Sequence, residues 1–319
     1  MTELIDACEL INKVIQPDLH DMITFPISGV ETFWWLPFLV MAFISSLTSI
    51  GGLSGAFILL PFQMTILGFT SPAVTPTNFL FNVVAIPSGV YRYIREGRMV
   101  WCLTWVIVLG TLPGIFAGGY IRIMLLPDAG NFKLFVALVL AYISSRLLRD
   151  IISNKDKKPS RSDKPFIVEN SSISMKKIQF DFIGNHHEVS TPAVFFLSLG
   201  VGVIGGVYGI GGGAIIAPFL VTIFRLPVHT IAGATLFGTF VSSVVGVLFY
   251  TSLGVMYAST GMSIQPDWAL GAMLGLGGAV GMYFGARSQR FLPSRLIKMV
   301  ILGSMMFVVV KYVIEFLQR

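Results

Sequence analysis

Residues 209–219 read GIGGGAIIAPF, and residues 52–62 read GLSGAFILLPF. A shift of 157 positions superposes four identical pairs in these two stretches: Gly52 and Gly209, Gly55 and Gly212, Pro61 and Pro218, and Phe62 and Phe219. Each stretch interrupts an apolar run with glycines, which separate 33–48 from 56–69 and 192–208 from 213–226. The sequence therefore predicts two related segments in which a helix is broken and a second, short helix begins.

The composition indicates that lipid surrounds this chain. Apolar residues make up 54% and charged residues only 12% of the sequence, with a mean hydropathy of +0.79. Soluble domains carry about twice that charged fraction, and so few charges would leave large apolar patches in water. The net charge of +6 comes from basic residues in short loops between apolar stretches. We interpret them as determinants of membrane topology, and we expect no nucleic-acid partner.

Six apolar stretches are long enough, or nearly so, to cross a hydrocarbon core that needs roughly 20 residues: 78–94, 101–126, 131–149, 230–252, 267–287 and 293–316. The two glycine-broken pairs, 33–69 and 192–226, are too long for one such helix and too short for two. We therefore predict an all-α polytopic membrane protein. Each half consists of a glycine-broken helical hairpin followed by three transmembrane helices.

Basic loops orient these spans. Arginines and lysines gather in 92–98, 149–191 and 287–298, and the positive-inside rule places all three in the cytoplasm. Both termini then lie outside the cell membrane, and each hairpin leaves the bilayer on the side where it entered. The predicted regions are an extracytoplasmic amphipathic arm (1–32), a first transmembrane repeat (33–150), a basic cytoplasmic loop (151–191) and a second transmembrane repeat (192–319).

The similarity between the halves continues beyond the hairpins. A shift of 167 positions superposes another set of identical residues: Trp101 and Trp268, Gly110 and Gly277, Gly114 and Gly281, and Gly118 and Gly285. Because the charge pattern makes the two halves enter the bilayer from opposite sides, we predict inverted repeats. This plan is common in secondary transporters, whose substrate site lies at the repeat interface near the midplane. An old duplication in a membrane protein with another task is the alternative.

The glycine breaks are the predicted substrate site. Each break leads into a short helix whose N-terminal N–H groups and partial positive charge suit an anion. Two pairs of polar residues, each four positions apart, share a helix face nearby. The candidate binding residues are Gly52, Gly55, Asn78, Asn82, Gly211, Gly212, Thr235 and Thr239. The alternative for the polar residues is interhelical hydrogen bonding without any ligand.

The centres of the predicted spans contain no Asp, Glu, Lys, Arg or His. Arg122 and Asp267 stand at span ends, and we interpret both as anchors at the membrane interface. Proton-coupled cation transport, which needs intramembrane carboxylates, is therefore disfavoured. We also expect no fixed positive charge at the depth of the site.

Catalytic and metal-binding motifs are missing from the sequence. The two cysteines, Cys8 and Cys102, match no redox or metal spacing, and the adjacent His186 and His187 make no metal site by themselves. No hydrolase triad, Walker loop or metalloprotease motif is present. We predict no catalytic residues, no metal ligands and no cofactor, and the chain is not expected to be an enzyme.

The glycine stretch Gly209–Gly213, with Ala217-Pro218-Phe219 and the later Gly233-Ala234-Thr235 and Gly238-Thr239, resembles the TauE/SafE sulfite exporter family. Gly51-Gly52 to Pro61, and Asn78 to Gly89, resemble the first repeat of that family. The resemblance covers roughly residues 33–316. It implies export, or in some members uptake, of small sulfur-containing anions such as sulfite or a sulfonate, which agrees with the anion site inferred from the glycine breaks.

Three alternatives stay open. An anion channel shares every feature described, an uptake permease for another small organic anion differs only in direction, and a membrane-embedded enzyme is disfavoured by the missing catalytic groups. The expected partners are the lipid bilayer and a small anionic substrate. The sequence is compatible with a homodimer and does not specify the oligomeric state.

Overall fold

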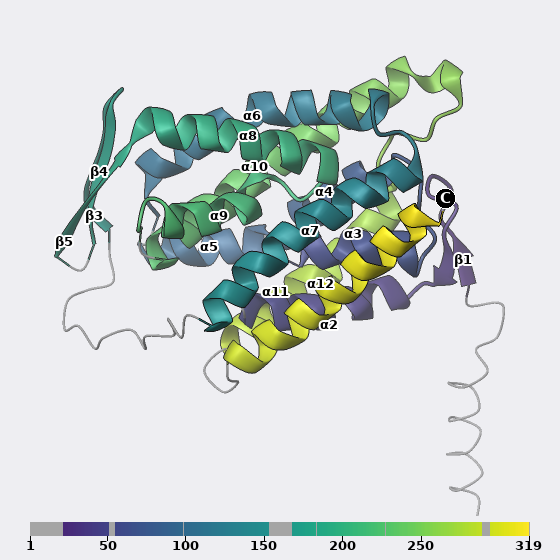
Figure 1. Cartoon of the computed structure of the whole chain (residues 1–319), viewed down its shortest axis with the longest axis horizontal. Coiled ribbons are helices and arrows are strands. Elements are labelled where there is room, and N and C mark those ends of the chain that lie inside the picture. Colours follow the sequence, from purple (N-terminus) through teal and green to yellow (C-terminus); the bar gives the residue numbers. More distant parts are fainter. Residues whose placement is uncertain are drawn as a thin grey trace, which may run out of the picture.

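The structure is a computed structural model, and it describes residues 22–50, 55–97, 99–152, 168–182, 184–226, 228–288 and 294–318. Gly52 and the predicted amphipathic arm, apart from its last residues, lie outside the described residues. The described part is predominantly helical, which confirms the all-α membrane class. Most helices run along the long axis of the molecule, and the strands of the described part lie at its two ends (Figure 1).

The two predicted hairpins appear as α2 (Leu36–Ile50) with α3 (Ala56–Thr65) and α8 (Thr191–Tyr208) with α9 (Gly212–Thr222). The remaining long helices are α6 (Trp101–Met124), α7 (Ala129–Ile152), α10 (Val228–Met256), α11 (Trp268–Ser288) and α12 (Ser294–Leu317). Within the described residues, five helices are long and apolar enough to cross a membrane: α6, α7, α8, α10 and α11. The glycine-broken second arm of each hairpin is too short to do so.

The predicted span 78–94 is wrong as a single helix. It consists of α4 (Val74–Ala85) and α5 (Pro87–Arg95), which meet at Ile86. Pro87 has no N–H to donate, and its ring clashes with the carbonyl four residues earlier, so a helix is destabilised at this point, whereas the first position of a new helix tolerates proline. The helix α4 is consequently a short apolar segment, and α5 carries the exposed arginines of the basic loop.

The region 151–191, expected to be a loop, contains a three-stranded antiparallel sheet. Its strands are β3 (Val168–Ile173), β4 (Lys177–Phe182) and β5 (Asn185–Ser190). Ile178, Phe180 and Phe182 alternate with polar residues along β4 and are buried against the first turns of α6 and α8. Side chains that alternate in this way point to one face of a strand, so the sheet covers the ends of these two helices.

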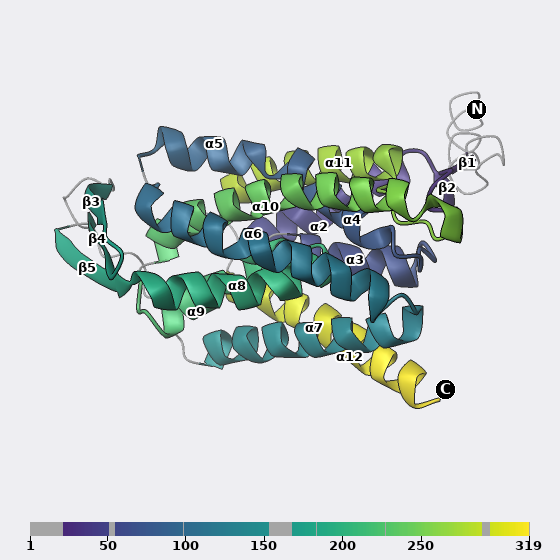
Figure 2. The same ribbon diagram turned by 90° about the horizontal axis from the view of Figure 1, so that it is seen from above.

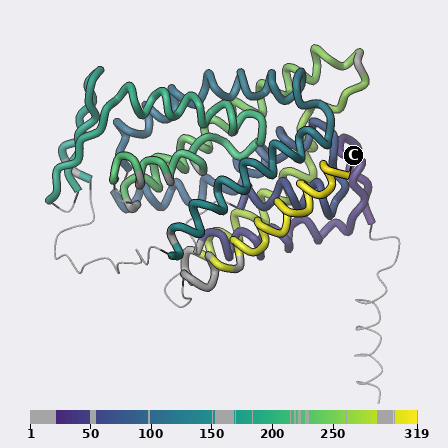
Figure 3. Tube along the Cα trace, in the orientation of Figure 1, coloured from purple at the N-terminus to yellow at the C-terminus, as the bar shows by residue number. Residues whose placement is uncertain are grey.

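A short hairpin of β1 (Met22–Thr24) and β2 (Glu31–Phe33) lies at the opposite end of the molecule from β3–β5. The same end receives the end of α12, as the trace in Figure 3 also shows. Ser28, in the turn of this hairpin, donates to Asp267 from both its backbone N–H (3.0 Å) and its hydroxyl (2.8 Å). Asp267 Oδ1 also accepts from the N–H of Leu270 at 3.1 Å, so this carboxylate caps the start of α11.

Two rows of glycines join the halves of the chain. A Cβ added at Gly110, Gly114 or Gly118 of α6 would meet the carbonyls of Phe195, Leu199 and Val203 of α8. A Cβ added at Gly277, Gly281 or Gly285 of α11 would meet the carbonyls of Phe38, Ala42 and Ser46 of α2. The helices α6 and α8 lie side by side in both views (Figures 1 and 2). Small residues allow such close backbone approach in membrane helices.

These two rows are related by the shifts found in the sequence. A shift of 167 positions superposes the glycines of α6 on those of α11. A shift of 157 positions superposes the residues of α2 that contact α11 on the residues of α8 that contact α6. The helices α7 and α12 pack against each other outside this double pair (Figure 2). The contact of α6 in the first half with α8 in the second half is therefore repeated by the contact of α11 in the second half with α2 in the first.

Candidate functional site

The second break requires glycine at two positions. The helix α8 ends at Tyr208, and Gly209 adopts φ 84°, with its N–H donating to the carbonyl of Gly205. Gly211, the residue before α9, has φ 76° and ψ 157°, a conformation that residues with a side chain adopt only under strain. The turn between α8 and α9 is therefore shaped by glycine itself.

Carbonyl groups at the end of α8 lack helical partners, and at membrane depth water does not replace them. Three side chains from other helices donate to them: Tyr250 Oη to Gly206 O at 2.9 Å, Thr75 Oγ1 to Val207 O at 3.1 Å, and Asn82 Nδ2 to Ile210 O at 3.0 Å. Asn82 Nδ2 also reaches Gly209 O at 3.4 Å. The second break is thus held largely by α4, which belongs to the first half of the chain.

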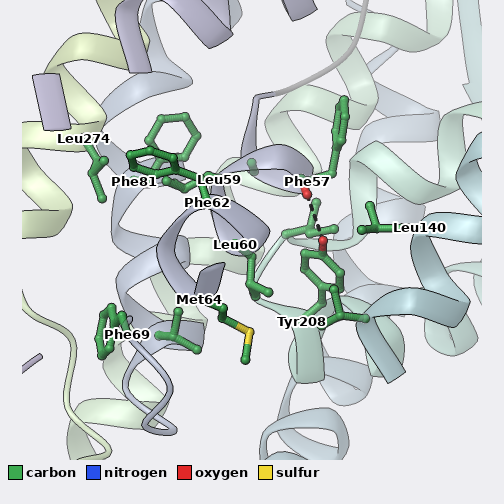
Figure 4. Packing of buried hydrophobic residues seen from close by; sticks show 14 of the residues in the cluster. Phe57, Leu59, Leu60, Phe62, Met64, Phe69, Phe81, Leu140, Tyr208 and Leu274 are labelled. Carbon is green, nitrogen blue, oxygen red and sulfur yellow. Dashed lines mark hydrogen bonds between the residues drawn. The ribbon is translucent and has the colours of Figure 1, made fainter. Parts of the chain in front are cut away.

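The described part of the first break begins at Gly55, which caps α3 with an ordinary helical conformation (φ −64°, ψ −14°). Asn78 Nδ2 donates to Ala56 O at 3.2 Å, and the hydroxyl of Tyr208 donates to Phe57 O at 2.8 Å, the bond drawn in Figure 4. Tyr208 is the last residue of α8. One break therefore hydrogen-bonds to the other through a side chain.

The helices that follow the breaks begin in the same way. Neither Gly55, before α3, nor Gly211, before α9, has a side chain that could cap the N–H groups of the first turn. A buried serine hydroxyl without a hydrogen-bond partner faces each glycine: a Cβ built on Gly55 would lie 2.8 Å from Ser45 Oγ, and one built on Gly211 would lie 3.2 Å from Ser243 Oγ. Each helix start therefore lacks a side-chain cap and lies beside a buried hydroxyl without a hydrogen-bond partner.

The structure brings most of the predicted site residues together around these starts. Gly55, Asn78 and Asn82 lie at or between the two breaks, and Gly211 packs against Thr239 and Gly212 against Thr111. Gly213, one residue further, meets both Thr235 and Thr239. Because α4 carries Asn78 at the first break and Asn82 at the second, this short helix connects the two.

The predicted donors are occupied in this conformation. Both asparagine amides use their NH2 groups on backbone carbonyls, which leaves Oδ1 of each residue buried without a partner. Thr235 donates to Ala232 O at 3.1 Å and Thr239 to Thr235 O at 2.9 Å, both within α10. The donor groups of these four residues therefore have acceptors within the protein, whereas Ser45 Oγ and Ser243 Oγ have none.

Both charged residues predicted at span ends are buried, so the prediction of interfacial anchors is wrong. Asp267 is 1% exposed and caps α11, and Arg122 is 0% exposed. Arg122 Nε donates to Thr75 Oγ1 at 3.3 Å, and one terminal nitrogen donates to the carbonyl of Leu126. Thr75 of α4 and Phe132 of α7 cover the guanidinium, so the position of Arg122 near a span end does not place it at the surface.

Sequence reasoning also missed Ser45 and the bond from Tyr208. The signal for Ser45 was its polarity within an apolar run, whereas a tyrosine in such a run is common and gave no signal. Among the described residues, no group of three or more His, Cys, Asp or Glu side chains is arranged to hold a metal ion.

Comparison with known proteins gives matches over the same region. The family described as "Sulfite exporter TauE/SafE" matches residues 37–312, most of the chain. A curated protein of Bacillus subtilis (strain 168), described as "Probable membrane transporter protein YunE", is 23% identical over 236 residues, which cover 71% of this chain and 81% of the relative. No solved structure matches at a significant level.

Proposed function

The chain belongs to the TauE/SafE sulfite exporter family of membrane transporters, and we propose that it is a secondary transporter that exports a small sulfur-containing anion such as sulfite or an organosulfonate. Five helices long and apolar enough to span a bilayer agree with a multi-pass protein of the cell membrane. The glycine breaks form the substrate site, and the bilayer and the anion are the partners.

The paired helix starts are the observation that carries this proposal. A sulfur oxyanion presents several acceptor oxygens and no strong donor. The start of α9 offers N–H groups that no side chain caps, and Phe57 adds its N–H from the first turn of α3, where Ile58 donates to Gly55 O at 3.1 Å. Ser45 and Ser243 each add a buried hydroxyl without a hydrogen-bond partner. Backbone donors at helix N-termini bind anions without placing a full charge in the membrane. Gly55, Gly211 and Gly212 let the anion approach the backbone, and the proposal assigns the same role to Gly52, which lies outside the described residues.

Asn78, Asn82, Thr235 and Thr239 act in this proposal as positioning residues. The two asparagines fix the breaks by hydrogen bonds, and the two threonines pack against Gly211 and Gly213 at the second break. The unpartnered Oδ1 atoms of both asparagines add two acceptors beside the breaks. An anion that carries a proton satisfies such acceptors better than one that carries none.

Alternating access follows if the halves are inverted repeats. Phe79 of α4 lies against Gly246 of α10, and Leu236 of α10 lies against Gly89 of α5. The shift of 157 exchanges these two contacts, and the paired segments run in opposite directions. Such an exchange is what a two-fold axis perpendicular to the helices produces, which supports repeats inverted across the membrane plane. Rocking one half against the other would open the breaks first to one side and then to the other.

An inside-negative potential favours the exit of an anion by roughly 2.3 kcal/mol per charge per 100 mV. Export therefore needs no proton relay within the spans. A channel would use the same potential, but its conductance would far exceed the turnover of a carrier. The rate of flux at saturating substrate separates these two functions.

The test uses the purified full-length chain in proteoliposomes loaded with labelled sulfite, with a sulfonate and sulfate as competitors. We expect saturable efflux that a sulfonate inhibits. S45A and S243A each remove one hydroxyl with little change in volume, and both should weaken sulfite binding by about threefold to tenfold. T251A, which removes a hydroxyl bonded within α10 away from the breaks, is the control. No flux of any sulfur anion would reject the function, and unchanged affinity in both serine variants would reject the site.

Topology needs a separate experiment. Single cysteines placed in 151–191 and near either terminus, in a chain without Cys8 and Cys102, can be labelled from one side of intact cells. We expect the loop to react only from the cytoplasm and both termini only from outside. Labelling of the loop from outside would overturn the inverted arrangement.

A further inference from the structure

Arg122 is a charged side chain that the proposed substrate site does not explain. It lies in the last turn of α6 and has no exposed surface. Its guanidinium stacks on the ring of Phe132 at 3.7 Å from the ring centroid. Nε and one terminal nitrogen have hydrogen-bond acceptors, and Nη2 is buried without one.

A buried guanidinium is costly unless its charge and all of its donors are satisfied. Asp128, just beyond the end of α6, attracts Arg122 electrostatically. Its Oδ2, however, accepts from the N–H groups of Gly130 (2.9 Å) and Asn131 (3.0 Å) at the start of α7. Among the described residues, no carboxylate makes a hydrogen bond to the guanidinium. The aromatic ring lowers the cost of the charge but provides no acceptor for Nη2.

The position of Arg122 relates it to the second break. The helices α6 and α8 rise together, with Gly114 beside Leu199 and Gly118 beside Val203, so Arg122 lies level with the end of α8. Thr75 forms the connection, because its hydroxyl accepts from Arg122 Nε at 3.3 Å and donates to Val207 O at 3.1 Å. A single side chain, that of Thr75, therefore connects Arg122 by hydrogen bonds to the backbone of the second break.

The second half has no equivalent cation in register. The shifts of 166 and 167 that relate the ends of α6 and α11 place Arg122 on Ser288 or Gln289. A structural role common to both halves would call for a similar residue in each. Arg122 lies on the flank at which α6 ends, which the topology prediction places outside, whereas the nearest arginines of the second half, Arg287 and Arg290, are each one position out of register.

We propose that Arg122 is an anion-binding residue of the transport path, in which Nη2 binds an oxygen of the sulfur oxyanion as it passes between the second break and the end of α6. This inference rests on the proposed function. Nε remains on Thr75 and keeps the guanidinium oriented. The anion supplies the hydrogen-bond acceptor for Nη2 and the negative charge that no carboxylate of the described residues brings to the guanidinium. Because Arg122 has no permanent ion-pair partner among those residues, its charge lets the protein select anions.

The experiment compares R122Q with R146Q in the purified full-length chain. Arg146 of α7 is the matched control, because its guanidinium also lies over aromatic rings, 5.5 Å from the centroid of Tyr142 and 5.3 Å from that of Phe219. Glutamine keeps a donor for a backbone carbonyl and loses the charge. We expect R122Q to bind sulfite and methanesulfonate about tenfold or more weakly, and R146Q to bind both as the wild type does.

Two results would overturn the inference. One is unchanged affinity for both anions in folded R122Q, with wild-type binding intact, which would leave Arg122 as a cap of the α6–α7 turn. The other is an equal loss in R146Q, which would mean that charge anywhere in the protein matters. A wild-type chain that binds neither anion would reject the proposed function and this inference together, so the two failures are distinguishable.

R122K provides a second measurement if R122Q does not fold. Lysine keeps the charge but loses it readily when buried, whereas arginine does not. Methanesulfonate remains a monoanion, so its affinity for R122K should fall as the pH rises from about 6 to about 9, while that of the wild type stays constant. An R122K affinity that equals the wild-type value at every pH would overturn the inference.

Discussion

The two breaks carry related sequences but are built differently. The second break depends on glycine conformations, φ 84° at Gly209 and φ 76° at Gly211, and on donors from α4 and α10. The described part of the first break uses an ordinary helical conformation at Gly55 and accepts a hydroxyl from Tyr208. The backbone of the second break is therefore fixed by the conformations of its own glycines and by donors from α4 and α10. The described part of the first break is fixed mainly by side chains of neighbouring helices. Replacing equivalent residues should show this difference.

The largest expected difference is between G211A and G55A. Alanine at position 211 must adopt φ 76° and ψ 157°, and its Cβ would lie 2.8 Å from Thr239 Cγ2. We expect a loss of about 3 kcal/mol of unfolding free energy. Alanine at 55 fits its backbone, and the hydroxyl of Ser45, 2.8 Å from the added Cβ, can rotate away, so the loss should be about 1 kcal/mol or less. Unfolding by SDS titration measures both, and equal losses would contradict the comparison.

The next difference concerns the two asparagines of α4. N82L leaves the carbonyls of Gly209 and Ile210 without their donor and should cost about 2–3 kcal/mol. N78L loses a single bond to Ala56 O and should cost about 1 kcal/mol.

The same variants separate positioning from ligand contact. If the asparagines only position the breaks, the folded fraction of N82L should bind sulfite within about threefold of the wild-type affinity. A loss of affinity with no loss of stability would instead identify Asn82 as a direct ligand of the anion.

The smallest effects are expected from the two buried tyrosines that donate to backbone carbonyls. Y208F removes the bond to Phe57 O in the first break, and Y250F removes the bond to Gly206 O at the second. Each should cost about 1 kcal/mol. Hydrogen exchange locates the change: Y208F should speed exchange in α3, and Y250F should speed exchange at the end of α8. Faster exchange in both regions for either variant would mean that the breaks open as one unit.

Much of the fold follows from patterns that are local in sequence. The hairpin arms, α6, α7, α10 and α11 were predicted within a few residues, because long apolar runs and glycine clusters determine where helices begin and end in lipid. The split of 74–95 at Pro87 was also readable from the residue itself but was missed. So were the alternating Ile178, Phe180 and Phe182 of β4, because the basic residues around them suggested a loop.

The candidate site was predicted less completely. The sequence identified the glycines and the polar pairs on α4 and α10, since polar residues in apolar spans are rare and costly. It could not tell that Asn82 donates to Ile210 O, 128 positions away, or that Tyr208 joins the breaks. The sequence also led us to interpret Arg122 as an interfacial anchor, because it stands near the end of a span. Position along a helix does not show which side chains of other helices cover a residue.

The sequence by itself determined that this chain is an integral membrane protein, that it contains two related halves, and that glycine interrupts a helix in each. These properties depend on hydrophobicity, on charge in loops and on the absence of a Cβ, all of which belong to single residues and their neighbours in the chain. The tertiary structure decided which groups remain available to a ligand. The NH2 groups of Asn78 and Asn82 find their acceptors on other helices, so only the packing shows that these donors are occupied. It also shows that the two serines and Arg122 retain buried atoms without a hydrogen-bond partner.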